Sequence, residues 1–135
     1  MPSRAPVQII DESNLPLPTI SWESIFFSAK KELKKLKPLT IIFVSNVRSQ
    51  ELNSRYRKKN APTNVLSFPE EREIVIAPAV VRKEAKTSGF TYKYWMTRLI
   101  VHGIVHLEGY NHRTRKERHA MEMIEGKILK ILFPI

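Results

Sequence analysis

The sequence predicts a single α+β domain in which a mixed central sheet of about four strands is packed by helices. Its 135 residues lie within the usual range for one domain, so residues 1–135 are expected to form one unit. Hydrophobic residues make up 42% and charged residues 27%, which is typical of a globular chain and not of a disordered one. The elements predicted along the chain follow the order β-α-β-α-β-β-α-α-α.

The first half of the chain is predicted to alternate between strand and helix. A β-branched run near the N-terminus precedes a proline-rich loop, and Ser21 stands where it can cap a helix whose apolar residues recur at helical spacing. An apolar, β-branched run after Pro38 indicates a buried strand, and Asn46 is expected to cap a short helix. The predicted ranges are residues 7–10 and 39–44 for the strands and residues 21–36 and 46–56 for the helices.

The second half is predicted to form a hairpin followed by three helices. Two β-rich runs joined by PEER are suited to antiparallel pairing. Gly89 and Gly109 can each end a helix, and Thr114 and Glu117 have the spacing of a capping box. The predicted strands are residues 65–68 and 73–77, and the predicted helices are residues 79–87, 92–107 and 114–132.

The chain is strongly basic, with 23 Lys and Arg against 13 Asp and Glu, a net charge of +10. Two segments concentrate this charge: residues 30–59 hold ten basic and two acidic side chains, and residues 82–118 hold nine and three. A basic run is often only the solvated face of a helix, but the overall excess favours a polyanionic partner. RNA or another nucleic acid is the first expectation, and an anionic membrane surface is the second.

Several classes of protein are excluded by composition. The chain has no cysteine, so it has no disulfide, no thiol nucleophile and no Cys-ligated metal, and any metal must be held by His, Asp or Glu. No apolar run approaches the ~20 residues of a membrane span or has the pattern of a signal peptide. We therefore expect a cytoplasmic protein with no membrane association.

Three of the four histidines fall within the segment HGIVHLEGYNH. His102 and His106 are four residues apart and therefore share one face of the predicted helix. Gly109 can take a positive φ and reverse the chain, so that His112 approaches the same point. Three imidazoles leave a fourth position open on a zinc ion, as in catalytic zinc sites. The alternative is that they are ordinary helix and loop residues, as we expect for the fourth, His119.

This array also resembles the zinc-binding signature H-E-x-x-H-x-x-G-x-x-H of the metzincin proteases, which implies a metzincin-like zinc helix. The general-base glutamate of that signature is replaced here by Gly103. Glu108 is nearby, but its position on the helix is roughly opposite the histidine pair. A metzincin-like metalloprotease is therefore the lesser alternative.

Two motifs together, HGIVHLEGYNH and ELNSRYRKKNAPTNVLSFP (residues 51–69), resemble the YbeY family of bacterial metal-dependent endoribonucleases and rRNA maturation factors. The resemblance implies a small α+β domain that cleaves RNA of single-strand type in ribosomal RNA processing. It also implies that the three histidines are metal ligands and that Arg57 is the basic active-site residue. The chain departs from the family by having Asn60, Glu73 and Asn111 at positions that are usually Asp. The charges lost at positions 60 and 111 bear on any acid–base role there, and the ligands are intact.

Arg57 is predicted to bind the substrate phosphate and to take part in catalysis. A guanidinium can hold a phosphate at two points, and a zinc ion held by three histidines can polarise the phosphoryl group and activate water. The alternative is that Arg57 is one more surface cation in a basic run. Two functions remain open: a zinc-dependent endoribonuclease, and a non-catalytic RNA- or ribosome-associated binding protein with a structural metal.

Two further groups of residues have both a functional and a structural interpretation. One group can donate hydrogen bonds to a substrate or serve turn and strand formation. The other can stack on bases or pack in the core. The first group is Thr63, Asn64 and Ser67, and the second is Tyr92, Tyr94 and Trp95.

Overall fold

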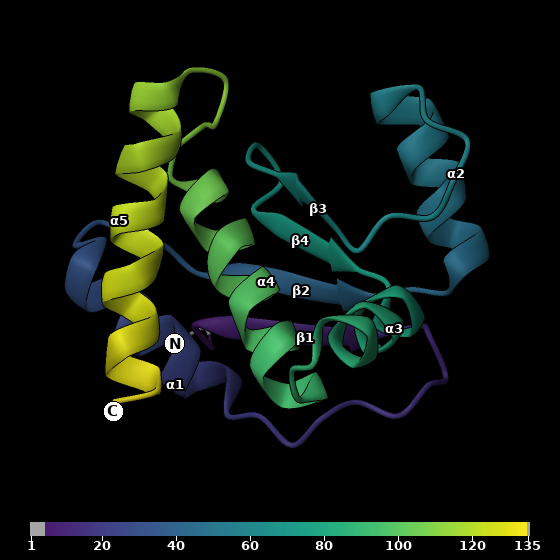
Figure 1. Ribbon diagram of the computed structural model, residues 1–135, viewed down its shortest axis with the longest axis horizontal. Coiled ribbons are helices and arrows are strands. Elements are labelled where there is room, and N and C mark those ends of the chain that lie inside the picture. The colour runs from purple at the N-terminus through teal and green to yellow at the C-terminus, as the bar shows by residue number, and fades with distance from the viewer. Residues whose placement is uncertain (1–4, 135) are drawn as a thin grey trace.

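A computed structural model describes residues 5–134 as a four-stranded sheet with five helices, in the predicted order (Figure 1). The α+β class and the mixed sheet are therefore confirmed. The strands are β1 (Val7–Asp11), β2 (Leu39–Phe43), β3 (Val65–Phe68) and β4 (Glu73–Ile76). The helices are α1 (Trp22–Glu32), α2 (Asn46–Arg57), α3 (Pro78–Ser88), α4 (Tyr92–Leu107) and α5 (Arg115–Leu132).

The strands lie in the order β1-β2-β4-β3. β1, β2 and β4 are parallel, with Ile41 of β2 opposite Ile74 of β4, whereas β3 runs antiparallel to β4 as the predicted hairpin requires. Arg72 closes the hairpin turn with a φ of 57° and a hydrogen bond from its N–H to the Pro69 carbonyl. Since β2 and β4 are flanked on both sides, their apolar sequences LTIIF and EIVI are buried in the middle of the sheet.

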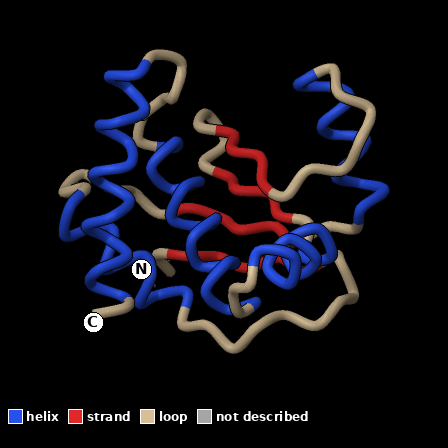
Figure 2. Tube along the Cα trace, in the orientation of Figure 1, coloured by secondary structure: helices blue, strands red, loops and turns tan. Residues whose placement is uncertain are grey.

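The two faces of the sheet carry cores of different size. Ile41 and Ile74 point into the large core, which includes residues of α1, α4 and α5. The alternate positions Ile42 and Val75 point to the other face and join Leu52 of α2 in a smaller cluster. Figure 2 shows α4 crossing one face of the sheet while α2 stands apart at the right of the view. α4 and α2 therefore approach the β3 end of the sheet from different directions.

Two predicted helix boundaries are wrong in detail. Ser45, and not Asn46, caps α2, because its hydroxyl accepts a hydrogen bond from the Arg48 N–H at 3.1 Å. α1 ends at Glu32 and does not continue to residue 36. Leu36 is nevertheless buried, because the chain turns after Leu33 and folds this side chain back into the core.

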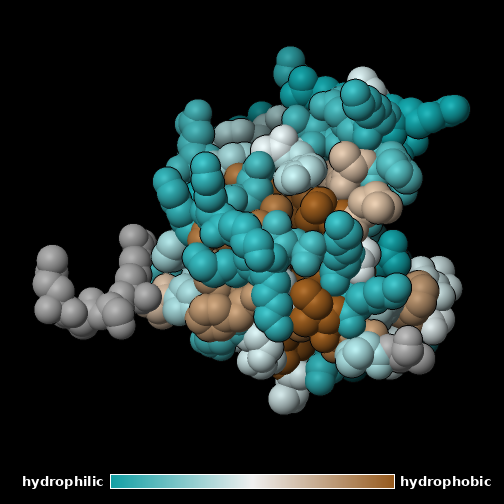
Figure 3. All heavy atoms as spheres, turned by 90° about the vertical axis from the view of Figure 1, so that its left-hand side faces the viewer, coloured by the Kyte–Doolittle hydropathy of each residue, from teal (hydrophilic) through white to brown (hydrophobic). Residues whose placement is uncertain are grey.

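The predicted capping signals of α3 and α5 are confirmed. Gly89 ends α3 in the left-handed conformation, with φ 78°. Thr114 and Glu117 form both hydrogen bonds of a capping box at the start of α5. Among residues 5–134, no helix is both long enough and apolar enough to cross a membrane. The side of the molecule that carries α1 and α5 is largely hydrophilic, with a strip of apolar residues between the polar ones (Figure 3).

Candidate functional site

The structure brings the three clustered histidines together at the C-terminal end of α4. His102 and His106 project from adjacent turns of this helix, and their ring centroids are 4.6 Å apart. Gly109 then adopts a φ of 95°, which is the left-handed region that glycine favours, and the chain reverses. The His112 ring consequently lies 5.0 Å from that of His106 and 5.9 Å from that of His102.

Hydrogen bonds orient two of these rings. The Nδ1 atom of His106 lies 2.9 Å from the Tyr110 carbonyl, which can only accept, so Nδ1 carries the proton. The Nδ1 atom of His102 lies 3.2 Å from Oε1 of Glu125, and an ionised carboxylate also only accepts. In the neutral tautomer that has its proton on Nδ1, each ring carries its lone pair on Nε2. Proteins commonly hold metal-binding histidines in this way, with Nδ1–H given to a carbonyl or carboxylate.

The three imidazoles have the chemistry of a divalent-metal site, and their rings lie at separations that can be compared with one. A zinc ion bound through Nε2 at about 2.0–2.1 Å lies about 3.2 Å from the ring centroid, so tetrahedral ligands have centroids about 5 Å apart. The observed separations of 4.6, 5.0 and 5.9 Å bracket this value. As the side chains stand, however, no group of three His, Asp or Glu in the described part of the chain is arranged to hold an ion. The ligand assignment therefore stays a prediction.

The surroundings of His106 favour its neutral form. Burial lowers the pKa of His106 below its usual 6.5, and the neighbouring His102 lowers it further. The hydrogen bond to the Tyr110 carbonyl acts in the opposite direction but does not reverse the effect. Because only a neutral imidazole can bind a metal, this shift keeps His106 available as a ligand.

Packing of α4 on the sheet explains why position 103 is glycine. A Cβ atom built on Gly103 would lie 3.0 Å from Cγ2 and 3.1 Å from Cδ1 of Ile74, a fully buried residue of β4. A glutamate at this position, as in a metzincin protease, would therefore point into the sheet. Glu108 is also turned away, since its carboxylate pairs with Arg72 at 2.8 Å. No carboxylate of α4 thus serves as the base that a protease of this type uses.

An open cleft of about 710 Å³ joins the histidines to the end of α2. The three histidines and Glu125 line it from α4, α5 and the loop between them, whereas Tyr56 and Arg57 line it from α2. Arg57 is the last residue of α2 and is exposed. Lys58 follows in the left-handed conformation and ends the helix. The structure therefore places the predicted phosphate-binding cation and the predicted metal ligands on the same cavity.

The loop that follows Arg57 is held in place by two buried polar side chains of α2. The Ser49 hydroxyl donates to the Thr63 carbonyl at 2.8 Å and accepts from the Thr63 N–H at 2.9 Å. The Asn53 amide donates to the Ala61 carbonyl at 2.8 Å. Ser49 and Asn53 are almost fully buried, so these hydrogen bonds are protected from water. They fix the cleft edge that carries Arg57.

The predicted hydrogen-bond donors line the cleft but have structural partners. Asn64 donates its side-chain amide to Glu84 at 3.0 Å, and Thr63 is bonded through its backbone to Ser49. The Ser67 hydroxyl faces the Gly103 carbonyl at 3.4 Å, a long contact. Each of the three residues therefore has a contact within the protein.

The predicted aromatic residues also take part in packing. Trp95 and Tyr92 pack against the large core. The Trp95 indole N–H donates to Glu84, and the Tyr92 hydroxyl donates to the Pro16 carbonyl. Tyr94 is partly exposed and contacts two other aromatic rings. His119 lies exposed on α5, away from the other histidines.

The positions where aspartate was expected have different surroundings. Asn60 accepts a hydrogen bond from Gln50 at 2.9 Å and is exposed, and Glu73 opens β4. Asn111 lines the cleft beside His112. Of these three residues, only Asn111 is close enough to the histidines to influence them.

Three polar residues of the cleft were not predicted from the sequence: Tyr56, Arg98 and Glu125. Glu125 had a detectable signal, because it lies four residues after Met121 and therefore interrupts the apolar stripe of the last helix with a charge. Tyr56 and Arg98 have no comparable signal in the sequence. The Tyr56 ring lies 5.2 Å from that of Phe68.

The chain is similar to proteins of one family. A family model described as Endoribonuclease YbeY matches residues 18–132, which include Arg57 and the clustered histidines. Endoribonuclease YbeY of Polynucleobacter asymbioticus is 40% identical over 114 residues, which cover 76% of this chain and 74% of that protein. Its counterpart in Bartonella bacilliformis is 38% identical, covering 68% and 66%, and that of Onion yellows phytoplasma is 35% identical, covering 81% and 83%.

The fold also resembles a solved structure. The solution structure of TM1509 from Thermotoga maritima superposes with a TM-score of 0.54 at 20% identity, covering 93% of this chain and 91% of that one. At this identity the likeness supports the α+β architecture alone.

Proposed function

Because the chain belongs to the endoribonuclease YbeY family, we propose that it cleaves RNA of single-strand type during ribosomal RNA processing in the cytoplasm. Membership confirms the family predicted from the sequence and, with it, the prediction of a hydrolase of the nuclease class. The proposal adds the substrate, the zinc ion and the roles of individual residues. Its partners are ribosomal RNA or ribosomal subunits.

One observation carries the proposal: Arg57 and the three histidines line the same open cleft. Cleavage of a phosphodiester needs a cation that holds the phosphate and a centre that provides the nucleophile. A zinc ion bound by His102, His106 and His112 would polarise the phosphoryl oxygen and lower the pKa of a bound water. The open cleft lets a polymer enter, and the net charge of +10 attracts it.

Residues in and beside the cleft have distinct tasks in the proposal. Arg57 is exposed and attached to the end of a helix, so its guanidinium can reach a phosphate across the cleft. Glu125 accepts the Nδ1 proton of His102 and the Tyr110 carbonyl accepts that of His106, which leaves both Nε2 atoms free to bind the metal. Ser49 and Asn53 are positioning residues, because they hold the loop next to Arg57.

The geometry supports an enzyme over a binding protein with a structural metal. Structural zinc sites have four protein ligands and are closed to water. Here the carboxylate nearest the histidines, Glu125, is directed at Nδ1 of His102, and His112 is exposed at the cleft. Water or substrate in the cleft would therefore have access to an ion held by these histidines.

Metal removal tests the proposal. The chelator-treated protein is incubated with a fragment of ribosomal RNA that has an unpaired segment, and zinc is then added back in steps. Cleavage should be absent after chelation and should return in proportion to zinc, reaching a plateau at one ion per chain. Full cleavage by the metal-free protein would contradict the proposal. The His119→Ala variant is the matched control, because His119 lies outside the cleft and should give the wild-type titration.

A further inference from the structure

We propose that an aromatic cluster outside the cleft, formed by Phe90, Tyr94, Trp95 and Phe133, binds the continuing strand of single-stranded RNA by base stacking. The inference rests on the proposed function, since it extends the substrate path of the same site. It assigns a binding role to side chains at the start of α4 and the end of α5, about 10 Å or more from the histidines along the axis of α4.

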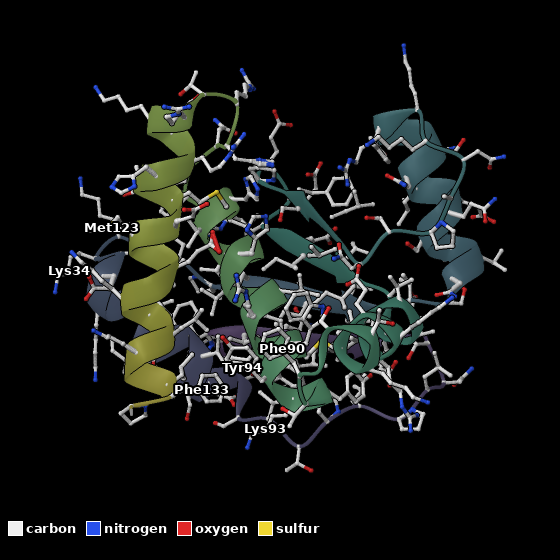
Figure 4. All side chains as sticks on the ribbon, in the orientation of Figure 1. Lys34, Phe90, Lys93, Tyr94, Met123 and Phe133 are labelled. Carbon is white, nitrogen blue, oxygen red and sulfur yellow. The ribbon has the colours of Figure 1, made fainter. Side chains whose placement is uncertain are left out.

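The cluster is a continuous row of aromatic rings, of which Phe90 is exposed and the other three are half-buried. Phe90 stacks on Trp95, with centroids 5.3 Å apart and planes at 10°, and contacts Tyr94 at 5.2 Å. Tyr94 in turn contacts Phe133 of the α5 C-terminus at 5.1 Å. Figure 4 shows Phe90, Tyr94 and Phe133 side by side near the lower end of α4. Phe90 is 44% exposed, so part of its ring is free to meet a base.

Arg98 connects this cluster to the cleft. It lines the cleft, and its guanidinium carbon lies 5.6 Å from the centroid of the Trp95 ring. Tyr94, Arg98 and His102 are spaced four residues apart and therefore lie along one face of α4. A strand that leaves the histidines along this face meets a cation first and the aromatic rings next.

The charge around the cluster suits RNA. Lys93 and Arg98 are exposed, and neither forms an ion pair among residues 5–134. The carboxylate of Glu84 does reach Trp95, but it accepts hydrogen bonds from the indole and from Asn64. Aromatic rings with adjacent cations are the combination by which proteins hold single-stranded nucleic acid without reading its sequence. A purely apolar protein partner would not need the cations.

Length-dependent binding tests the proposal without requiring cleavage. The metal-free protein is titrated into fluorescein-labelled oligouridylates of increasing length, and anisotropy gives the dissociation constant. For the wild type, affinity should rise when the strand becomes long enough to pass beyond the cleft. The Phe90→Leu variant keeps an apolar side chain but no ring, so its affinity for long strands should fall about tenfold while its affinity for the shortest strands stays unchanged. The Phe90→Trp variant should bind as the wild type does.

The Phe27→Leu variant changes another exposed phenylalanine, on α1, and should bind all strands as the wild type does. Equal binding of long strands by Phe90→Leu and wild type would overturn the proposal, and it would do so even if that variant lost binding to a protein partner. Length-dependent binding that Phe90→Leu loses supports the cluster even if the wild type never cuts RNA, in which case only the proposed function fails.

Discussion

The contact between Glu125 and His102 gives a prediction about metal affinity. The Glu125→Gln variant keeps the size and one acceptor oxygen of the side chain but removes its charge. We expect it to bind zinc about tenfold more weakly than the wild type, because an uncharged amide makes Nε2 of His102 a weaker ligand and no longer fixes its tautomer.

The structure sets the expected size of this effect. Loss of a hydrogen-bond partner of a metal-binding histidine costs about 10–100-fold in affinity. The contact here is 3.2 Å long, and the His102 side chain is 32% exposed, so water can replace part of the lost interaction. We therefore place the loss at the lower limit, about 1.4 kcal/mol.

Competition with a chromogenic zinc chelator measures this affinity. Glu122→Gln is the matched control, because Glu122 is an exposed glutamate on the same helix and does not line the cleft. The control should bind zinc as tightly as the wild type. Equal zinc affinity for Glu125→Gln and wild type would refute the assignment of Glu125 as the partner that orients His102.

Three further predictions concern the cleft and its support. The Arg57→Ala variant should lose about tenfold or more in turnover at saturating RNA, with unchanged zinc content, and Arg57→Lys should recover only part of it; unchanged turnover would make Arg57 a mere surface cation. The Gly103→Glu variant should be less stable in urea unfolding by at least about 1–3 kcal/mol, because its Cβ atom would meet Ile74 at 3.0 Å; wild-type stability would show that α4 can move away from the sheet. Because burial, and then His102, holds the folded pKa of His106 below 6.5, the unfolded chain takes up protons more readily. The unfolding free energy of the metal-free protein should thus fall as the pH decreases below about 6.5, and fall less in His106→Leu; equal pH profiles would contradict this.

Local signals explain why so much of the fold could be predicted. The Thr114 capping box, the left-handed Gly89 and the reversal at Gly109 each depend on residues close in sequence, and the structure has all three. Local signals also explain the error at the start of α2, where Ser45 and not Asn46 is the cap. Both residue types are good caps, and only the backbone geometry distinguishes them. The parallel order β1-β2-β4 is different, because it depends on packing between distant segments.

The candidate site also has one part that local sequence signals predict and another part that depends on packing between distant segments. His102, His106 and His112 lie in one short segment, so helix periodicity and one glycine suffice to predict that they meet. Glu125 follows His102 by 23 residues on another helix, and its direction depends on how α5 packs against α4. Arg57 and the histidines share one cleft only because the sheet brings α2 and α4 together. From the sequence, this proximity could be predicted only through the family resemblance.

Cleavage rate and zinc content, measured on the same samples of wild type and His106→Ala, test the central claim most directly. The account predicts that the wild type holds one zinc ion per chain and cuts ribosomal RNA. The His106→Ala variant should hold little zinc and cut at least a hundredfold more slowly, because His106 is a ligand of the ion that activates the nucleophile. Wild-type cleavage by a His106→Ala protein free of metal would contradict the account.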